Sequence, residues 1–292
     1  MRTVHSGPVL GLIIQIVLLA GLAGTLGLSG AGWLAGVAYG VVVCVLLMRG
    51  LRHSQRAGLS PADWVTLTRA TLVGGVTALT VDSFDRPVPV GVLVALTTVA
   101  LVLDGVDGQV ARRTGIVTAL GALFDQEVDA FLLMVLSVYV VYVAAPVGAW
   151  ALAIGGMRYV FAVATWVLPW MRGTLPPRYW RKVVAAAQGV VLVLAAADVL
   201  PRPLAVTVVA AALALLVESF GRDVLWLWQH RPVRTAQRRR VASSLRVGPQ
   251  TRTGNRLLVY IRAHVVGARI RDDTARMLFL QVRAGADEET PT

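Results

Sequence analysis

The sequence predicts an all-α, polytopic membrane protein: a bundle of about eight transmembrane helices that ends in a basic tail. Hydrophobic residues make up 56 % of the 292 residues, and charged residues make up only 15 %. Soluble domains average about 45–50 % apolar and about 25 % charged residues. The mean hydropathy is +0.68, and the apolar residues fall in long runs without charges. These three observations indicate a membrane protein rather than a soluble protein with a large core.

Eight apolar stretches are long enough to cross a bilayer, whose hydrocarbon core needs about 20 residues of helix. The first follows Arg2 in the manner of a signal peptide. It is about twenty residues long and a second stretch follows directly, so we expect a retained helix. The stretches are 8–28, 31–49, 64–82, 88–104, 119–144, 147–170, 182–200 and 203–228.

Arginines mark one side of the predicted bundle. They follow the second, fourth and sixth stretches, and the tail carries thirteen arginines against five acidic residues. The alternate connections are short, and their only basic residues are Arg86 and Arg202. Because positive residues favour the cytoplasmic side, we expect a multi-pass protein of a bacterial plasma membrane with both termini in the cytoplasm.

The composition divides the chain into three parts: two additional N-terminal helices in 1–50, a six-helix core in 60–228 and a basic cytoplasmic tail in 229–292. The net charge of +12 is also typical of nucleic-acid binding. Here the positive charge lies in the tail and in short loops beside apolar runs, which favours anionic membrane lipids as partners and no nucleic acid. Cys44 is the single cysteine, so no disulfide forms within the chain.

Four aspartates interrupt the apolar pattern around the connection between the fourth and fifth stretches. Asp104 and Asp107 are spaced i, i+3, and Asp125 and Asp129 are spaced i, i+4, so each pair lies on one helix face. The first pair alone could be solvated helix caps. The second pair lies inside an apolar helix, where each acid costs about 2.5–3.5 kcal/mol. Divalent cations such as Mg²⁺ or Mn²⁺ neutralise converging carboxylates, which predicts a metal centre.

These aspartates belong to a longer pattern, D-x-x-D-G-x-x-A-R-x8-G-x3-D-x3-D, that runs from Asp104 to Asp129. It resembles the signature of the CDP-alcohol phosphatidyltransferases at all eight fixed positions. The resemblance implies a membrane enzyme of phospholipid biosynthesis that moves a phosphatidyl group from a CDP-diacylglycerol-type lipid to a small polar alcohol and releases CMP. It also implies two divalent ions, Mg²⁺ or Mn²⁺, as cofactors, and it makes 60–228 the expected catalytic core.

The resemblance implies a role for each matched residue. The expected metal ligands are Asp104, Asp107, Asp125 and Asp129. The expected contacts to the CDP-linked lipid are Asp104, Gly108, Ala111, Arg112 and Thr66. In that family the residue matched by Asp129 is the proposed general base. Gly121 is expected to let the two helices of the hairpin approach closely.

A weaker match to the same family precedes the third stretch. Asp63, Thr66 and Arg69 fit the family's P-N-x-x-T-x-x-R spacing, with Asp63 in place of Asn and Pro61 one position early. Independently of the family, Ser60 and Pro61 have the pattern of a helix start. Asp63 is therefore either a capping residue or a match to the family's Asn, and Thr66 is a predicted nucleotide contact.

The acceptor alcohol is predicted from Arg158, Lys182 and Gln188. Arg158 lies near the middle of the sixth stretch, where its charge is costly unless a phosphate or an acid such as Glu127 or Glu218 meets it. Lys182 and Gln188 match part of a G-K-x-K-T-x-x-Q segment of the phosphatidylglycerophosphate synthase branch. We expect a phosphorylated polyol, with glycerol 3-phosphate ahead of inositol phosphate, and another alcohol as the alternative.

Two other classes of protein fit parts of the pattern. A transporter also combines many spans with intramembrane charges, but it predicts an internal repeat and broken helices in matching halves, and the sequence has neither. A structural membrane anchor with a basic tail does not explain why four aspartates lie within the apolar pattern. We therefore expect an enzyme whose active site opens to the cytoplasm, and a homodimer, as is typical of the family it resembles.

Overall fold

The structure is a computed structural model that describes residues 6–54, 58–114, 118–144, 147–173, 175 and 179–230. The chain divides into two units, Met1–Arg231 and Pro232–Thr292. The second unit holds nearly all of the predicted basic tail and lies outside the described residues. All of the helices named below belong to the first unit.

Every regular element among the described residues is helical, which confirms the all-α, polytopic fold class. Six helices are long and apolar enough to cross a membrane, and Val90–Val106 is apolar but shorter. The α-helices are α1 (Ser6–Leu26), α2 (Gly30–His53), α3 (Pro61–Asp82), α4 (Val90–Thr114), α5 (Ala119–Tyr139), α6 (Leu152–Val167), α7 (Tyr179–Ala196) and α8 (Arg202–Gln229). A π-helical turn, η1 (Val140–Ala144), extends α5, and the 3-10 turns η2 (Ala149–Ala151) and η3 (Pro169–Arg172) flank α6.

The start of α3 is fixed by a capping box. Ser60 Oγ accepts a hydrogen bond from the backbone N–H of Asp63 at 3.2 Å, and the Asp63 carboxylate accepts one from the backbone N–H of Ser60 at 2.8 Å. Pro61 occupies the first helical position, where an N–H would have no partner within the helix. Asp63 is therefore a capping residue, which was one of its two predicted roles.

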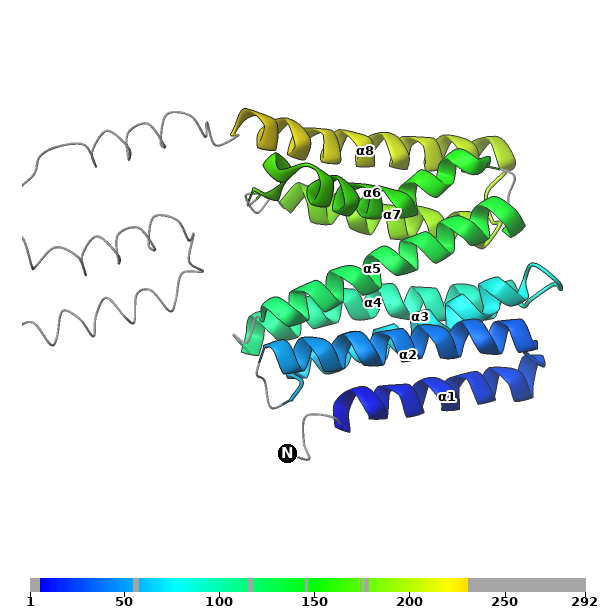
Figure 1. The fold of residues 1–292 in the computed structure, drawn as a ribbon. Coiled ribbons are helices and arrows are strands. Elements are labelled where there is room, and N and C mark those ends of the chain that lie inside the picture. Colours follow the sequence, from blue (N-terminus) through cyan, green and yellow to red (C-terminus); the bar gives the residue numbers. More distant parts are fainter. Residues whose placement is uncertain are drawn as a thin grey trace, which may run out of the picture. The chain divides into compact units, whose positions relative to one another are not determined.

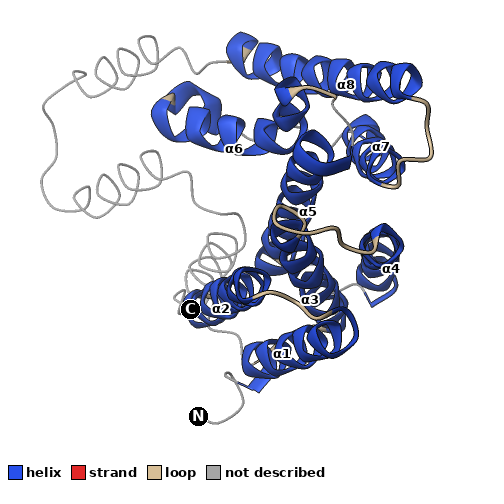
Figure 2. Ribbon diagram, turned by 90° about the vertical axis from the view of Figure 1, so that its right-hand side faces the viewer, coloured by secondary structure: helices blue, strands red, loops and turns tan. Residues whose placement is uncertain are grey.

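α3 is the central helix of the first unit. Of its most apolar window 72 % is buried, against 17–44 % for the other candidate spans, and it packs against α1, α2, α4 and α5. Figure 1 shows α5 crossing between a group formed by α1–α4 and a group formed by α6–α8, and the turned view in Figure 2 shows the same division. α7 also joins the two groups, because it packs on α8, α5 and α4.

Two predicted helix boundaries were wrong. The stretch 147–170 is not one helix, because Leu168 adopts an extended conformation (φ −105°, ψ 98°) between α6 and η3. Pro169 explains this break, since a residue before proline is driven out of the helical region. The fourth helix is longer than predicted and continues to Thr114 rather than ending at residue 104.

Asp82, the last residue of α3, fixes the connection between α1 and α2. Its buried carboxylate accepts a hydrogen bond from the backbone N–H of Ser29 at 2.9 Å and another from Nε of Arg86 at 2.6 Å. Ser29 is itself the N-cap of α2, where its hydroxyl accepts from the N–H of Gly32 at 3.2 Å. The two N-terminal helices are thus attached to α3 at the end opposite the arginine-rich connections.

Candidate metal centre

Three of the four predicted aspartates come together between α4 and α5. Asp104 lies on α4, and Asp125 and Asp129 lie about one turn apart on α5. One carboxylate oxygen from each residue lies within 4.8 Å of the other two. The three side chains keep 41, 36 and 38 % of their surface exposed. The group is therefore both convergent and accessible to a ligand.

Arg69 brings a fourth side chain into this group from α3. Its side chain is fully buried, and its guanidinium forms ion pairs with Asp104 and Asp125 and lies 3.1 Å from the carboxylate of Asp129. It also donates a hydrogen bond to the backbone carbonyl of Asp125 at 3.2 Å. The sequence matched Arg69 to a family motif but assigned it no role, because nothing in its spacing shows which residues it meets.

The charges and donor atoms of this group fit a divalent cation. Among the described side chains, three carboxylates lie around one guanidinium. Carboxylate oxygens are the hard donors that Mg²⁺ and Mn²⁺ prefer, and one oxygen from each aspartate lies within 4.8 Å of the others. The residues present therefore fit the metal role that the sequence predicts for them.

Four other matched residues of the pattern lie on α4, at positions whose side chains lie outside those that the structure describes. They are Asp107, Gly108, Ala111 and Arg112. The backbone of α4 is helical through all four positions, so Asp107 follows Asp104 by about one turn on a similar face. Their predicted contacts to metal and to the CDP-linked lipid stay predictions.

Gly121 approaches α3 closely, and its predicted approach to the other helix of the hairpin stays a prediction. A Cβ atom at Gly121 would lie 2.4 Å from Oδ1 of Asp63, so a larger residue would collide with the capping box of α3.

Thr66, the predicted nucleotide contact, is buried on α3, and its hydroxyl donates a hydrogen bond to the backbone carbonyl of Ala62 at 3.2 Å.

Arg158 on α6 forms an ion pair with Glu127, which lies between the two aspartates of α5 in sequence. Nε of Arg158 is buried and has no hydrogen-bond partner among the described residues. Glu218, the other acid considered as a partner, instead pairs with Arg222 and accepts a hydrogen bond from Trp180 at 3.3 Å. The guanidinium of Arg158 is thus only partly satisfied by Glu127.

The two predicted acceptor residues on α7 lie in different surroundings. Gln188 is fully buried, and its amide donates a hydrogen bond to the backbone carbonyl of Ala212 on α8 at 2.8 Å. Lys182 is exposed, and its neighbour Arg181 lies 3.5 Å from Asp223 on α8. Gln188 therefore faces the α7–α8 interface, and its contact to an acceptor stays a prediction.

Residues 59–218 match the sequence model of a family described as CDP-alcohol phosphatidyltransferase. The match begins just before α3, ends within α8, and covers more than half of the chain. No curated protein and no solved structure matches the chain. The matched region holds Arg69 and the three converging aspartates, together with the full signature from Asp104 to Asp129. The chain is therefore a member of the CDP-alcohol phosphatidyltransferase family.

Proposed function

We propose that the donor is CDP-diacylglycerol and that the acceptor is a phosphorylated polyol, with glycerol 3-phosphate ahead of inositol phosphate. Family membership makes the chain a transferase of phospholipid biosynthesis that moves a phosphatidyl group from a CDP-linked lipid to an alcohol. The observation that carries the proposed site is the convergence of Asp104, Asp125 and Asp129 within 4.8 Å. These carboxylates suit the divalent ions that such a transfer uses.

In the proposed reaction, the hydroxyl oxygen of the acceptor forms a bond to the phosphorus of the phosphatidyl group. The bond from that phosphorus to the bridging diphosphate oxygen breaks, CMP leaves with that oxygen, and the hydroxyl proton passes to Asp129. Divalent ions held by the aspartates would supply positive charge where negative charge develops on the bridging oxygen. Arg69 holds the carboxylates of α4 and α5 on one guanidinium and so keeps their oxygens together.

The acceptor proposal rests on Arg158 and Lys182. An arginine inside an apolar stretch needs a phosphate or an acid beside it, and Glu127 is the acid that pairs with Arg158. The Arg158 side chain nevertheless stays 26 % exposed, so its guanidinium keeps capacity for a phosphate oxygen beside Glu127. Lys182 is exposed at the predicted cytoplasmic end of α7, where a flexible ammonium can reach a headgroup.

We further propose that the site faces the cytoplasm of a bacterial cell and that the protein works as a homodimer in the plasma membrane. The arginine-rich connections support the orientation. Tryptophans gather at both ends of the helices, as expected at the two membrane interfaces. Those at the predicted cytoplasmic end are Trp64, Trp166, Trp170, Trp180, Trp226 and Trp228, and those at the other end are Trp33 and Trp150.

An acceptor panel tests the proposal. Purified protein in detergent micelles containing CDP-diacylglycerol should release CMP fastest with glycerol 3-phosphate, more slowly with inositol phosphate, and least with uncharged glycerol or free inositol. CMP release that is equally fast with the uncharged alcohols would overturn the proposed acceptor class and leave the family's transfer reaction in place. The Asp125→Asn variant serves as the inactive control in every arm.

A further inference from the structure

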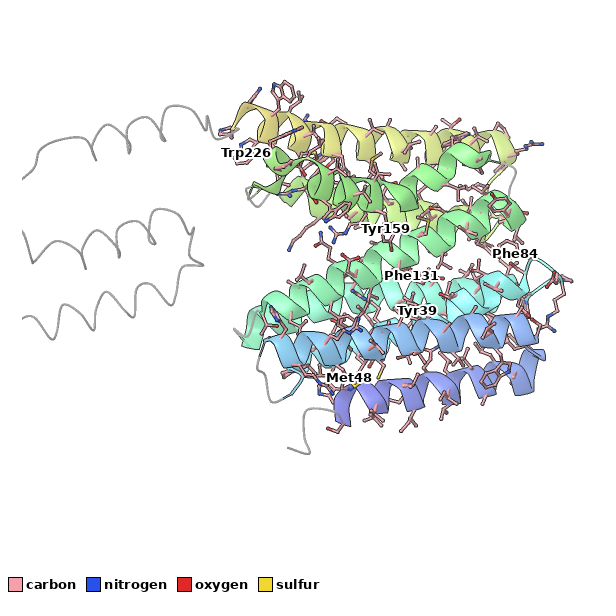
Figure 3. All side chains as sticks on the ribbon, viewed as in Figure 1. Tyr39, Met48, Phe84, Phe131, Tyr159 and Trp226 are labelled. Carbon is pink, nitrogen blue, oxygen red and sulfur yellow. The ribbon has the colours of Figure 1, made fainter. Side chains whose placement is uncertain are left out.

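α2 lies outside the region matched by the family, yet it contacts the helix that carries two of the aspartates. The ring of Tyr39 on α2 stacks on the ring of Phe131 on α5, with centroids 4.7 Å apart and planes inclined by 22°. Figure 3 shows the two labelled rings, one on each of these neighbouring helices. Phe131 follows Asp129 by two residues, so the stack lies next to the acidic segment of α5.

A second contact joins the same two helices near the start of α5. A Cβ atom at Gly50 of α2 would lie 2.3 Å from Cδ1 of Leu120. A side chain at this position would therefore push the end of the Leu120 side chain away from the backbone of α2. Leu51, the next residue of α2, is fully buried, so one face of this end of α2 packs against the protein interior.

These two contacts lie on either side of the aspartates along α5. Leu120 and Phe131 are separated by about 16 Å of helix at 1.5 Å per residue, and Asp125 and Asp129 lie between them. A helix held at both ends of such a segment cannot slide or rotate without losing one contact. Metal ligands have to be held to within about 0.5 Å of their working geometry, so the contacts with α2 bear on the metal centre.

The ring and the hydroxyl of Tyr39 have separate surroundings. The hydroxyl is buried without a hydrogen-bond partner among the described residues, as is Nε2 of Gln15 on α1. Both residues line a cavity of about 10 Å³ between α1, α2 and α3, which is about the room that one water molecule needs. Substitution by phenylalanine therefore changes this cavity and keeps the stack on Phe131.

We propose that α2 is a positioning element of the metal centre, in which the Tyr39–Phe131 stack and the Gly50–Leu120 contact hold the segment of α5 that carries Asp125 and Asp129. The inference rests on the proposed role of these aspartates as metal ligands. It assigns a role to α2, one of the two N-terminal helices that the family match leaves out. Tyr39 touches neither substrate nor metal in this arrangement and acts through α5.

The test is direct binding of Mn²⁺ to the purified full-length protein in detergent, without substrate, from the electron paramagnetic resonance signal of free Mn²⁺. Tyr39→Leu keeps apolar volume and loses the stack, and Gly50→Ala pushes Leu120 away. Since an aromatic pair is worth up to about tenfold in an equilibrium constant, Tyr39→Leu should weaken Mn²⁺ binding about three- to tenfold, and Gly50→Ala should weaken it by more than about twofold. Tyr39→Phe should bind like the parent protein. Leu34→Ala, at an exposed position of the same helix, should do so as well.

The outcomes separate this inference from the function on which it rests. Normal binding by the parent protein, with Tyr39→Leu and Gly50→Ala both within a factor of two of it, would overturn the role of α2 alone. Absence of Mn²⁺ binding to the parent protein would overturn the metal centre and this inference with it. Thermal unfolding in the presence of a chelator identifies a variant that fails to fold. In that case the other of the two variants tests whether α2 positions the metal centre.

Discussion

The guanidinium of Arg69 on α3 lies 3.1 Å from the carboxylate of Asp129 on α5. Arg69 is fully buried, and the same guanidinium pairs with Asp104 on α4 and with Asp125. One arginine of the central helix thus joins the two helices that supply the predicted metal ligands. The cluster of Asp104, Asp125 and Asp129, called the acidic group below, consequently depends on α3 for its geometry. Arg69 of α3 also offsets part of its negative charge.

Loss of this arginine should destabilise the protein most when divalent cations are absent. Arg69→Gln removes the guanidinium that pairs with all three carboxylates. The loss should stay below the about 3–5 kcal/mol typical of a broken buried pair, because the carboxylates are more than a third exposed. Thermal unfolding should show a lower Tm in chelator and a partial recovery in Mg²⁺. An equal drop in Tm with and without Mg²⁺ would contradict the inference that Arg69 and a divalent cation both offset the charge of these carboxylates.

Substitution of Arg158 should weaken binding of the acceptor and leave binding of the donor nearly unchanged. A charge-assisted hydrogen bond is worth about 1.5–3 kcal/mol, or roughly ten- to a hundredfold, so Arg158→Ala should raise the KM for glycerol 3-phosphate by that factor. The KM for CDP-diacylglycerol should change little. Steady-state CMP release over a range of both substrates measures these values.

Glu127→Gln is the matched control for that prediction. It removes the acid that pairs with Arg158 and leaves the guanidinium available to a phosphate, so the KM for glycerol 3-phosphate should fall or stay unchanged. If Arg158→Ala and Glu127→Gln instead lower the Tm alike and shift both KM values alike, the ion pair is structural. The phosphorylated acceptor then loses its main support.

Local sequence features predicted the helices and the convergence of Asp104, Asp125 and Asp129, because both follow from helical periodicity and from the high free energy of acids in an apolar helix. Residue pairs between distant helices could not be predicted in the same way. Glu127 and Glu218 were equal candidates as partners of Arg158, and only the packing of α6 on α5 distinguishes them. The meeting of Arg69 with the aspartates likewise depends on how α3 packs against α4 and α5. The break before Pro169, in contrast, was a local signal that the length of the apolar run concealed.

Asp82 should matter for stability and not for catalysis. Its buried carboxylate accepts hydrogen bonds from Ser29 and Arg86 at the end of the bundle away from the acidic group. Asp82→Ala leaves the N–H of Ser29 without its acceptor, at a cost of about 1–3 kcal/mol. Thermal unfolding should show a lower Tm, and both KM values should stay within a factor of two of the parent values below the new Tm. A raised KM with unchanged Tm would show that this end of the bundle takes part in substrate binding.

The predicted orientation can be checked with single cysteines in a Cys44→Ala background. Asp85 and Ser54 are both exposed. Asp85 lies just after the end of α3 and Ser54 lies just after the end of α2. Because these consecutive helices run in opposite directions, we expect the two residues on opposite sides of the membrane. In intact cells, an impermeant maleimide should label Asp85→Cys and should reach Ser54→Cys only after the membrane is permeabilised. Labelling in the reverse order would invert the topology and place the acidic group near the outer surface.

CMP release as a function of divalent cation measures the metal centre most directly. Purified protein with CDP-diacylglycerol and glycerol 3-phosphate should release CMP in Mg²⁺ or Mn²⁺ and stop in excess chelator. Asp125→Asn and Asp129→Asn should each abolish release, whereas Asp85→Asn, the same exchange in the connection before α4, should behave as the parent protein does. Full activity in excess chelator, or undiminished CMP release by Asp125→Asn, would contradict the assignment of the metal centre to Asp104, Asp125 and Asp129.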